Sequence, residues 1–261
     1  EVGLHEVERI HAEIKAVMRQ VGFVGTRDEF FRYLNTDPQF FFDRREDLIA
    51  GYVRIKQRVD PQLPRLFETL PKADYEIRAV EPFREKSAAG GQYQAASEDG
   101  SRPGIFYANA YDLRARPRWA MEALSLHEAN PGHHFQISIQ REQKGLPRFR
   151  RFGGYTAFSE GWGLYAESLG PELGMYTDPY QYFGRLEAEL FRAIRLVVDT
   201  GLHSKGWTRE QALDYIVANS ATSEARRVAE TERYIAIPGQ ALAYKIGQLK
   251  ISELRSRAEQ A

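Results

Sequence analysis

Apolar residues recur at helical spacing over much of the chain. In Val7–Gln20 they repeat every three or four positions, which predicts an amphipathic helix that ends at Gly22. The same criteria predict helices over 26–34 and 44–59. After residue 150 the helical pattern dominates again, and we expect helices at Thr156–Leu169, Pro179–Thr200, Thr208–Asn219, Glu224–Tyr234 and Gly239–Ala258.

Between these helical segments the pattern becomes typical of strands. Tyr75–Val80 alternates like a half-buried strand, Gly104–Asn109 reads as another, and Tyr93 is expected in a third. Three short strands among so many helices predict a mainly α-helical α+β fold with one small antiparallel sheet. We expect residues 1–261 to form a single domain.

Composition and charge narrow the classes of function. Lys+Arg and Asp+Glu are balanced at 36 each, so no overall field favours nucleic acid. The chain contains no cysteine, and any metal must therefore be held by histidine and carboxylate ligands. No apolar run approaches the roughly 20 residues that span a bilayer.

The first residues, E-V-G-L-H, contain neither an initiator Met nor a signal-peptide pattern. We therefore expect the chain to belong to a longer protein, with its N-terminal part as a partner. The sequence does not decide the compartment or the oligomeric state. Of the two compartments considered, we favour the periplasm or cell envelope over the cytoplasm.

The segment L-S-L-H-E-A-N-P-G-H-H-F-Q holds three of the six histidines. Its His127-Glu128 pair is the first half of the H-E-x-x-H zinc-peptidase signature, in which two His ligands lie one helical turn apart and the Glu is the general base. Four residues after His127, however, stands Pro131. The next candidate ligands are His133 and His134.

Helix geometry alone does not decide between these two histidines. On a straight helix the seventh residue returns to within about 20° of the first, which favours His134, but it lies roughly 10 Å along the axis. Zinc ligands lie ~2.1 Å from the metal, so the helix must be distorted. Pro131-Gly132 is a suitable place, and a local bulge would allow His133 to take the missing position.

A second segment, T-A-F-S-E-G-W-G-L-Y-A-E, supplies carboxylates. It is expected to be helical, with Glu160 and Glu167 seven residues apart on one face. A catalytic zinc needs a third protein ligand, and either carboxylate could serve. The other could orient a ligand histidine.

Together with these two segments, the strings D-T-G-L-H-S-K-G-W, R-Y-I-A-I-P-G-Q-A-L-A-Y and P-G-I-F-Y-A-N resemble the bacterial DUF885 family. The resemblance runs along nearly the whole chain. It implies a zincin-like domain of the gluzincin type and one Zn²⁺ per chain. Family members are usually about twice as long, which implies that this chain corresponds to a C-terminal, catalytic half.

The family motif H-E-x-x-P-G-H implies particular roles at the matching positions. His127 and His133 would be metal ligands, Glu128 the base and Glu160 the third ligand. Related peptidases have an edge strand just before the metal helix, so we expect Tyr107 and Asn109 at a substrate-binding strand edge.

Four further residues are candidates for substrate or transition-state contacts. His203, Tyr234 and Tyr244 could stabilise an oxyanion, and Arg233 could bind a substrate carboxylate in a bidentate fork. Each has an ordinary alternative. His203 could cap a helix C-terminus, the tyrosines could be packing residues, and Arg233 could lie on a solvated helix face.

The function that these observations predict is a zinc-dependent peptidase acting on short peptides. Two alternatives remain at this point. One is a metal-binding helical module without catalytic activity, although Glu128 argues against it because such a site needs no base. The other is a zinc hydrolase of a non-peptide amide or ester.

Overall fold

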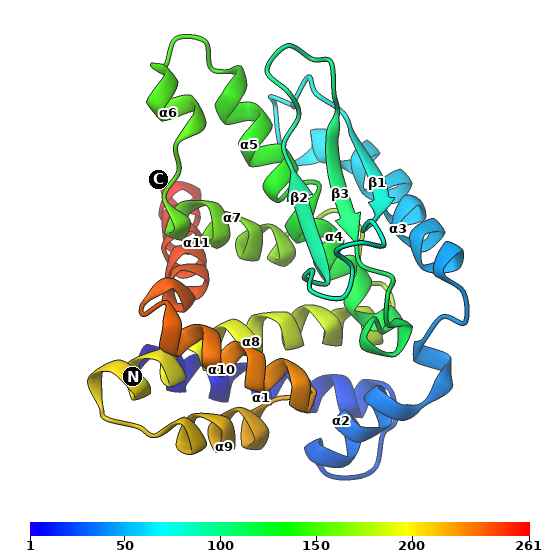
Figure 1. Ribbon diagram of the computed structural model, residues 1–261, viewed down its shortest axis with the longest axis vertical. Coiled ribbons are helices and arrows are strands. Elements are labelled where there is room, and N and C mark those ends of the chain that lie inside the picture. The colour runs from blue at the N-terminus through cyan, green and yellow to red at the C-terminus, as the bar shows by residue number, and fades with distance from the viewer.

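Helices form most of the protein, together with one three-stranded sheet (Figure 1). The computed structural model describes residues 1–261, apart from the side chain of Ala225. The helices are α1 (Val2–Gln20), α2 (Arg27–Thr36), α3 (Arg45–Val59), α4 (Met121–Glu128), α5 (His133–Glu142), α6 (Arg148–Phe152), α7 (Thr156–Ser168), α8 (Pro179–Ser204), α9 (Arg209–Asn219), α10 (Glu224–Ala236) and α11 (Ala243–Gln260). The strands are β1 (Tyr75–Ala79), β2 (Gly91–Gln94) and β3 (Gly104–Ala108). The predicted mainly helical α+β class is confirmed.

Several helix ends follow from local chemistry. The side chains of Thr208 and Gln211 form a capping box at the start of α9, as the sequence predicts for Thr208. The start of α11 differs from the prediction because Gly239 adopts the left-handed region with φ +79°, and the helix begins only at Ala243. The predicted end of α8 at Thr200 is also wrong, since the helix continues through one more turn to Ser204.

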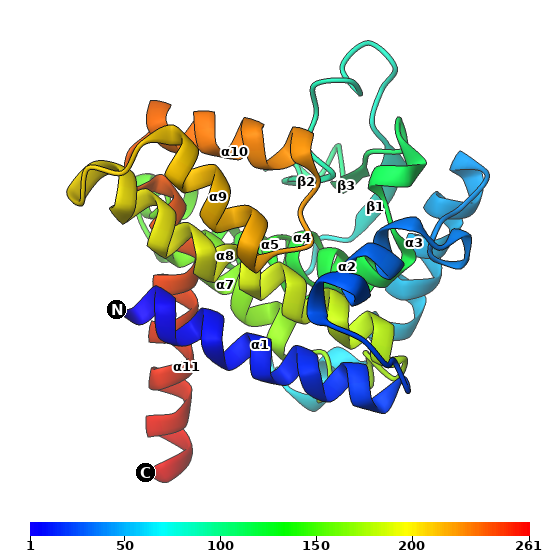
Figure 2. The same ribbon diagram turned by 90° about the horizontal axis from the view of Figure 1, so that it is seen from below.

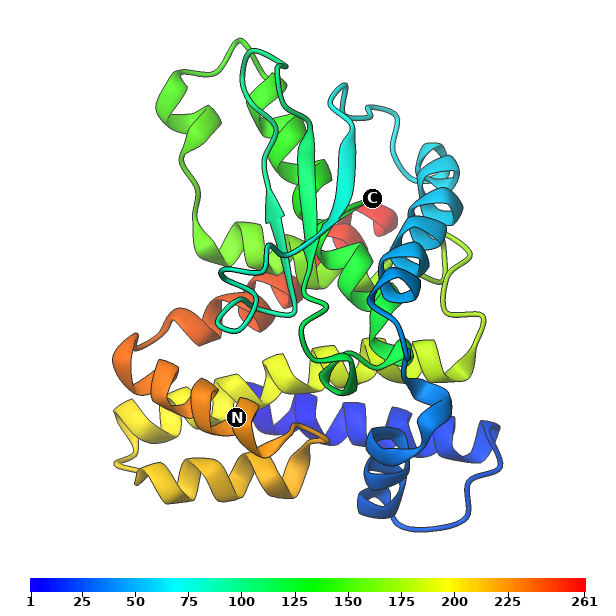
Figure 3. The same cartoon turned by 45° about the vertical axis from the view of Figure 1, so that its right-hand side comes forward.

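The sheet is mixed, which corrects the predicted antiparallel sheet. Its strand order is β1-β3-β2, with β2 antiparallel and β1 parallel to the central strand (Figure 3). Tyr93 of β2 and Ile77 of β1 both pair with Phe106 of β3. Alternation of apolar and polar residues identifies a strand but carries no information on the direction of its neighbour.

The sheet and the helices around it share one core. Phe106 on β3 is fully buried, and its ring centroid lies 5.1 Å from that of Tyr52 on α3. Leu126 of α4 and Tyr165 of α7 belong to the same apolar cluster. This cluster therefore holds α4 and α7 against the sheet.

A second apolar core lies between α1, α2 and α8. Ile10, Ile14, Phe30 and Leu190 are fully buried in it. Figure 2 shows α1 running alongside α8. The predicted face of the first helix is therefore confirmed as its buried face.

Buried charges also join α11 to this second core. The Lys245 ammonium, on a side chain with no exposed surface, lies 2.6 Å from carboxylate oxygens of Glu189 on α8 and Glu6 on α1. Breaking one partner of such a buried pair leaves an uncompensated charge and is strongly destabilising. The N-terminal end of α11 is thus held at one place on α8 and α1.

Two glycines set the distance between α7 and α11. A Cβ atom on Gly161 would lie 2.5 Å from Cα of Gly247, and one on Gly247 would lie 1.9 Å from the Ala157 carbonyl oxygen. The two backbones are therefore in direct contact, and only glycine fits at this crossing. This contact determines how closely α7 approaches α11.

A single added methyl group at this crossing is expected to destabilise the protein. Gly247→Ala should lower the free energy of unfolding by about 1–3 kcal/mol, because the helices must separate to accommodate the new Cβ. Urea denaturation measures this change. The matched control is Gly145→Ala, where an added Cβ meets no atom within 4 Å. Equal stabilities of the two variants would contradict the proposed close contact.

Candidate metal centre

A tight turn separates α4 from α5 and brings His133 back towards His127. The expected helix distortion at Pro131-Gly132 is confirmed, because α4 ends at Glu128 and α5 begins at His133. A Cβ atom on Gly132 would lie 2.0 Å from the His127 carbonyl oxygen, so the turn packs directly on the end of α4. The turn and the new helix thus place His133 near His127, where the i+4 histidine of the usual motif would lie.

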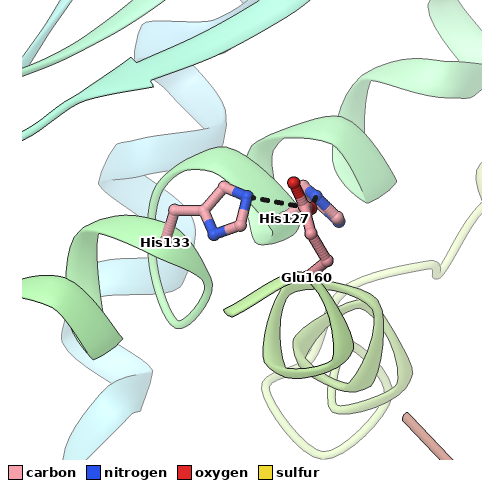
Figure 4. Close-up of side chains that lie close together, drawn as sticks. All are labelled: His127, His133 and Glu160. Carbon is pink, nitrogen blue, oxygen red and sulfur yellow. Dashed lines mark ion pairs between the residues drawn. The ribbon is translucent and has the colours of Figure 1, made fainter. Parts of the chain in front are cut away.

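Three candidate ligand atoms converge at this point (Figure 4). Nε2 of His127 and Nε2 of His133 each lie 3.4 Å from the same carboxylate oxygen, Oε2 of Glu160. All three atoms lie within 4.8 Å of one another. Ligands about 2.1 Å from a tetrahedral zinc are separated by roughly 3.4 Å, so this donor set has the chemistry and size for such an ion.

Glu167 lies on the other side of the His127 ring. Its carboxylate is 2.8 Å from Nδ1 of His127, and both side chains are buried. An acceptor there fixes a ring proton on Nδ1, so Nε2 is the atom that faces the cluster and could bind a metal ion in exchange for its own proton. Of the two carboxylates considered from the sequence, Glu160 therefore lies in the cluster, while Glu167 orients a histidine.

The charges in the cluster stabilise one another. Burial by itself would lower the pKa of His127, but hydrogen bonds to Glu160 and Glu167 outweigh it and raise the pKa to about 10. Burial would raise the pKa of Glu160, whereas hydrogen bonds from His127 and His133 hold it well below its ordinary value. The carboxylate is therefore ionised, as a metal ligand must be.

His134 does not belong to the cluster, although straight-helix spacing favoured it. Its Nδ1 lies 2.9 Å from the Tyr93 hydroxyl on β2, and its ring packs 4.6 Å from that of Tyr75 on β1. Burial lowers the pKa of His134 to about 4. This histidine is neutral and joins α5 to the sheet.

The predicted base, Glu128, occupies the last position of α4, directly after His127. Its side chain is half-buried. It therefore lies next to the cluster without being one of the three converging ligand groups.

The expected substrate edge at β3 is wrong. This strand is central, and both of its edges are already paired, with β1 and with β2. Asn109 is only 2% exposed and donates to the backbone carbonyls of Glu85 and Ala88. The Arg84 guanidinium packs on the Tyr107 ring, with its central carbon 4.6 Å from the ring centroid. The free edges of the sheet belong instead to β1 and β2.

Among the described residues, His203 and Tyr234 contact each other and not the three ligand groups. Nε2 of His203, in the last turn of α8, lies 2.9 Å from the Tyr234 carbonyl oxygen. The Tyr234 side chain is 1% exposed, and its hydroxyl accepts a hydrogen bond from Arg195 at 3.1 Å. In the part of the chain that the structure describes, neither residue hydrogen-bonds to the three ligand groups.

Tyr244, on α11, and Arg233, on α10, both contact side chains outside the three ligand groups. The Arg195 guanidinium packs on the Tyr244 ring at 4.6 Å from its centroid. Arg233 pairs with Glu230 at 3.4 Å and donates to the side-chain oxygen of Gln240 at 2.6 Å. The guanidinium of Arg233 is thus already engaged within the protein.

Two residues that support the site were not predicted from the sequence. The Trp162 indole N–H donates to the Pro131 carbonyl at 2.7 Å and so fastens the turn to α7. A Cβ atom on Gly163 would lie 2.8 Å from the His127 ring, so glycine allows α7 to approach that ring. For Gly163 the sequence did contain a signal, because a glycine inside a helical pattern indicates close packing.

The family described as "Bacterial protein of unknown function (DUF885)" matches residues 1–261. The chain belongs to the DUF885 family. No curated protein sequence matches this DUF885 chain.

Two solved structures resemble this DUF885 member. "The crystal structure of the putative lipoprotein from Colwellia psychrerythraea" matches with 45% identity and a TM-score of 0.95, over 99% of this chain and 45% of that one. A lipoprotein of unknown function from Shewanella oneidensis has the same fold at 18% identity, with a TM-score of 0.77, over 99% of this chain and 49% of that one. This chain therefore spans less than half the length of either structure. None of the helices that the structure describes could cross a membrane.

The buried, neutral state of His134 predicts a pH dependence of stability. Its pKa is about 4 in the folded protein, against ~6.5 in an unfolded chain. The unfolded chain therefore takes up a proton as the pH falls below ~6.5, and the folded protein does not until about pH 4. Stability should fall by roughly 2–3 kcal/mol between pH 6.5 and 4.5 from this residue alone.

Urea denaturation at the two pH values measures this contribution. His134→Gln, which has no titrating ring, should lose about 2–3 kcal/mol less than the wild type on acidification. If both proteins lose the same stability, His134 is not a buried neutral histidine.

Proposed function

We propose that this DUF885 protein is a zinc-dependent peptidase of the gluzincin type. The observation that carries the proposal is the convergence of His127, His133 and Glu160: each histidine nitrogen lies 3.4 Å from the carboxylate oxygen, and all three ligand atoms lie within 4.8 Å of one another. Two histidines and a glutamate leave one coordination position free, as catalytic zinc sites require.

The residues around the ion have distinct roles in this proposal. Bound Zn²⁺ supplies a Lewis acid that activates water and polarises the amide carbonyl. Glu128 receives the proton of the attacking water and passes it to the leaving amine. Glu167 holds the His127 ring in the orientation that ligation needs, through its 2.8 Å contact with Nδ1. Glu128 favours a hydrolase over a metal-binding module without activity.

The relatives with solved structures suggest the setting of this activity. Their chains are about twice as long as this one, and both are described as a "putative lipoprotein". We propose that a preceding part of the same protein covers the site and restricts it to short peptides, and that the protein acts in the cell envelope.

Removal of each ligand is expected to abolish zinc binding. Elemental analysis of the wild type is expected to give one zinc per chain. His127→Ala, His133→Ala and Glu160→Ala should each lose it, because three protein ligands are the minimum for such a site. Glu167→Gln should keep the stoichiometry at saturating zinc but weaken affinity about 10–100-fold.

His134→Gln is the matched control, since it changes the neighbouring histidine and should retain the metal. Loss of zinc in this control but not in His133→Ala would identify His134, and not His133, as the second histidine ligand. Wild-type protein that takes up no zinc would refute the metal centre.

Glu128→Gln is expected to separate metal binding from catalysis. Its zinc content should equal that of the wild type, whereas kcat on short peptides should fall by at least about 10²-fold through loss of the proton acceptor. Mass spectrometry of a peptide-length ladder measures this, and intact folded proteins should resist cleavage. A zinc-loaded wild type that cleaves only esters or non-peptide amides would point to the other hydrolase class.

A further inference from the structure

Three arginines gather around two aromatic rings between α8, α10 and the start of α11. The guanidinium carbons of Arg195 and Arg226 lie 4.9 Å and 4.4 Å from the centroid of the Phe191 ring. Those of Arg195 and Arg192 lie 4.6 Å and 5.7 Å from the centroid of Tyr244. We call Arg192, Arg195 and Arg226 the arginine cluster.

Only one member of the arginine cluster has a carboxylate partner. Arg195 pairs with Glu230 at 2.8 Å. Glu230 is shared, because Arg233 lies 3.4 Å from its other oxygen. Among the described residues, no carboxylate lies within the 4.0 Å ion-pair distance of Arg192 or Arg226. Positive charge therefore exceeds negative charge here, although the whole chain is neutral.

The excess charge is not relieved within the protein. Nη1 of Arg195 and Nε of Arg192 are buried without a hydrogen-bond acceptor. Burial lowers the pKa of Arg226, and the like charges of Arg192 and Arg195 lower it further, against the attraction of Glu187. The Arg226 side chain nevertheless remains exposed. An anion from solution can therefore reach Arg226, the exposed member of the cluster, and would reduce this repulsion.

The arginine cluster is connected to the candidate metal centre through α11 and α7. Tyr244, which covers two of the arginines, precedes Gly247 by one turn of α11, about 5 Å. Gly247 in turn contacts α7 at Gly161, the residue after Glu160. The cluster and the candidate metal centre therefore adjoin the same pair of crossing helices, α7 and α11.

We propose that the arginine cluster binds the C-terminal carboxylate of a peptide whose scissile bond lies at the metal centre. This inference rests on the proposed peptidase function. A carboxylate is planar and matches the donor fork of a guanidinium, which can bind both of its oxygens. Arg192 already donates through Nη1 to the Ala188 carbonyl but keeps Nε without an acceptor, and Arg226 forms no ion pair among the described residues. Arg233, the arginine favoured by the sequence, is engaged by Glu230 and Gln240. The protein would then remove residues from the C-terminal end of short peptides.

Binding can be tested without turnover. In zinc-loaded Glu128→Gln protein, isothermal titration calorimetry compares an acetylated tripeptide acid with the same tripeptide as its amide. The acid is expected to bind at least about tenfold more tightly, because a charged hydrogen-bonded pair is lost in the amide. This preference should decrease as salt is raised. Equal affinities, or no binding of the acid, would overturn the proposal.

Single substitutions then locate the carboxylate. Arg226→Gln and Arg192→Gln, made in the Glu128→Gln background, should each bring the affinity for the acid close to that for the amide and leave the amide unchanged. Arg54→Gln, an exposed arginine on α3, is the matched control and should retain the full preference. A preference that survives both cluster substitutions would exclude this site.

Cleavage assays distinguish failure of this inference from failure of the proposed function. If the acid binds preferentially and depends on Arg226 but no peptide is cleaved, the arginine cluster is a carboxylate site and the peptidase function is wrong. If acids and amides are cleaved equally and Arg226→Gln cleaves as the wild type does, the function stands and the inference fails.

Discussion

The contact of α7 with its neighbours on two sides is the constraint on which the site depends. On one side, Gly161 meets Gly247 of α11 backbone to backbone. On the other, Gly163 lies against the ring of His127 on α4. Glu160 directly precedes Gly161 in sequence, so the position of its carboxylate is set by packing that involves no ligand at all. The candidate centre is therefore preorganised by the helix core.

Two helices that contact α7, α11 and α4, are themselves fixed to other parts of the fold. α11 is fixed to α8 and α1 by the buried Lys245 ammonium and two carboxylates. α4 is fixed to the sheet through the core that contains Phe106 and Leu126. Ligands on α4, α5 and α7 thus belong to elements that the fold holds by separate means, with His134 adding a link from α5 to β2. Small relative movements of these supports would change the ligand separations.

Sequence reasoning identified the residues that converge at the candidate site better than it identified their surroundings. His127 and Glu160 could be found because few residue types bind zinc and the resemblance supplied their spacing. The direction of β1 could not be found, since strand alternation is the same in parallel and antiparallel pairs. The central position of β3 was missed for the same reason, and with it the roles of Tyr107 and Asn109.

The arginine cluster was also missed, for a different physical reason. Arg192 and Arg195 lie one turn apart in a segment whose apolar residues dominate the helical pattern, and a charged residue there reads as part of a solvated face. Their partners come from α10 and α11, more than 30 positions later in the chain. No local pattern records which charges meet across such a distance, or which remain unpaired.

The turn at Gly132 has a consequence for protein engineering. Because its backbone rests on the carbonyl oxygens of Leu126 and His127, the two histidines are related by a folded loop and not by helical periodicity. A designer who transplanted only the ligand side chains onto a regular helix, in the original order, would place them about 9 Å apart along its axis. Transfer of this centre to another scaffold therefore requires the backbone of the turn as well, with glycine at its closest point.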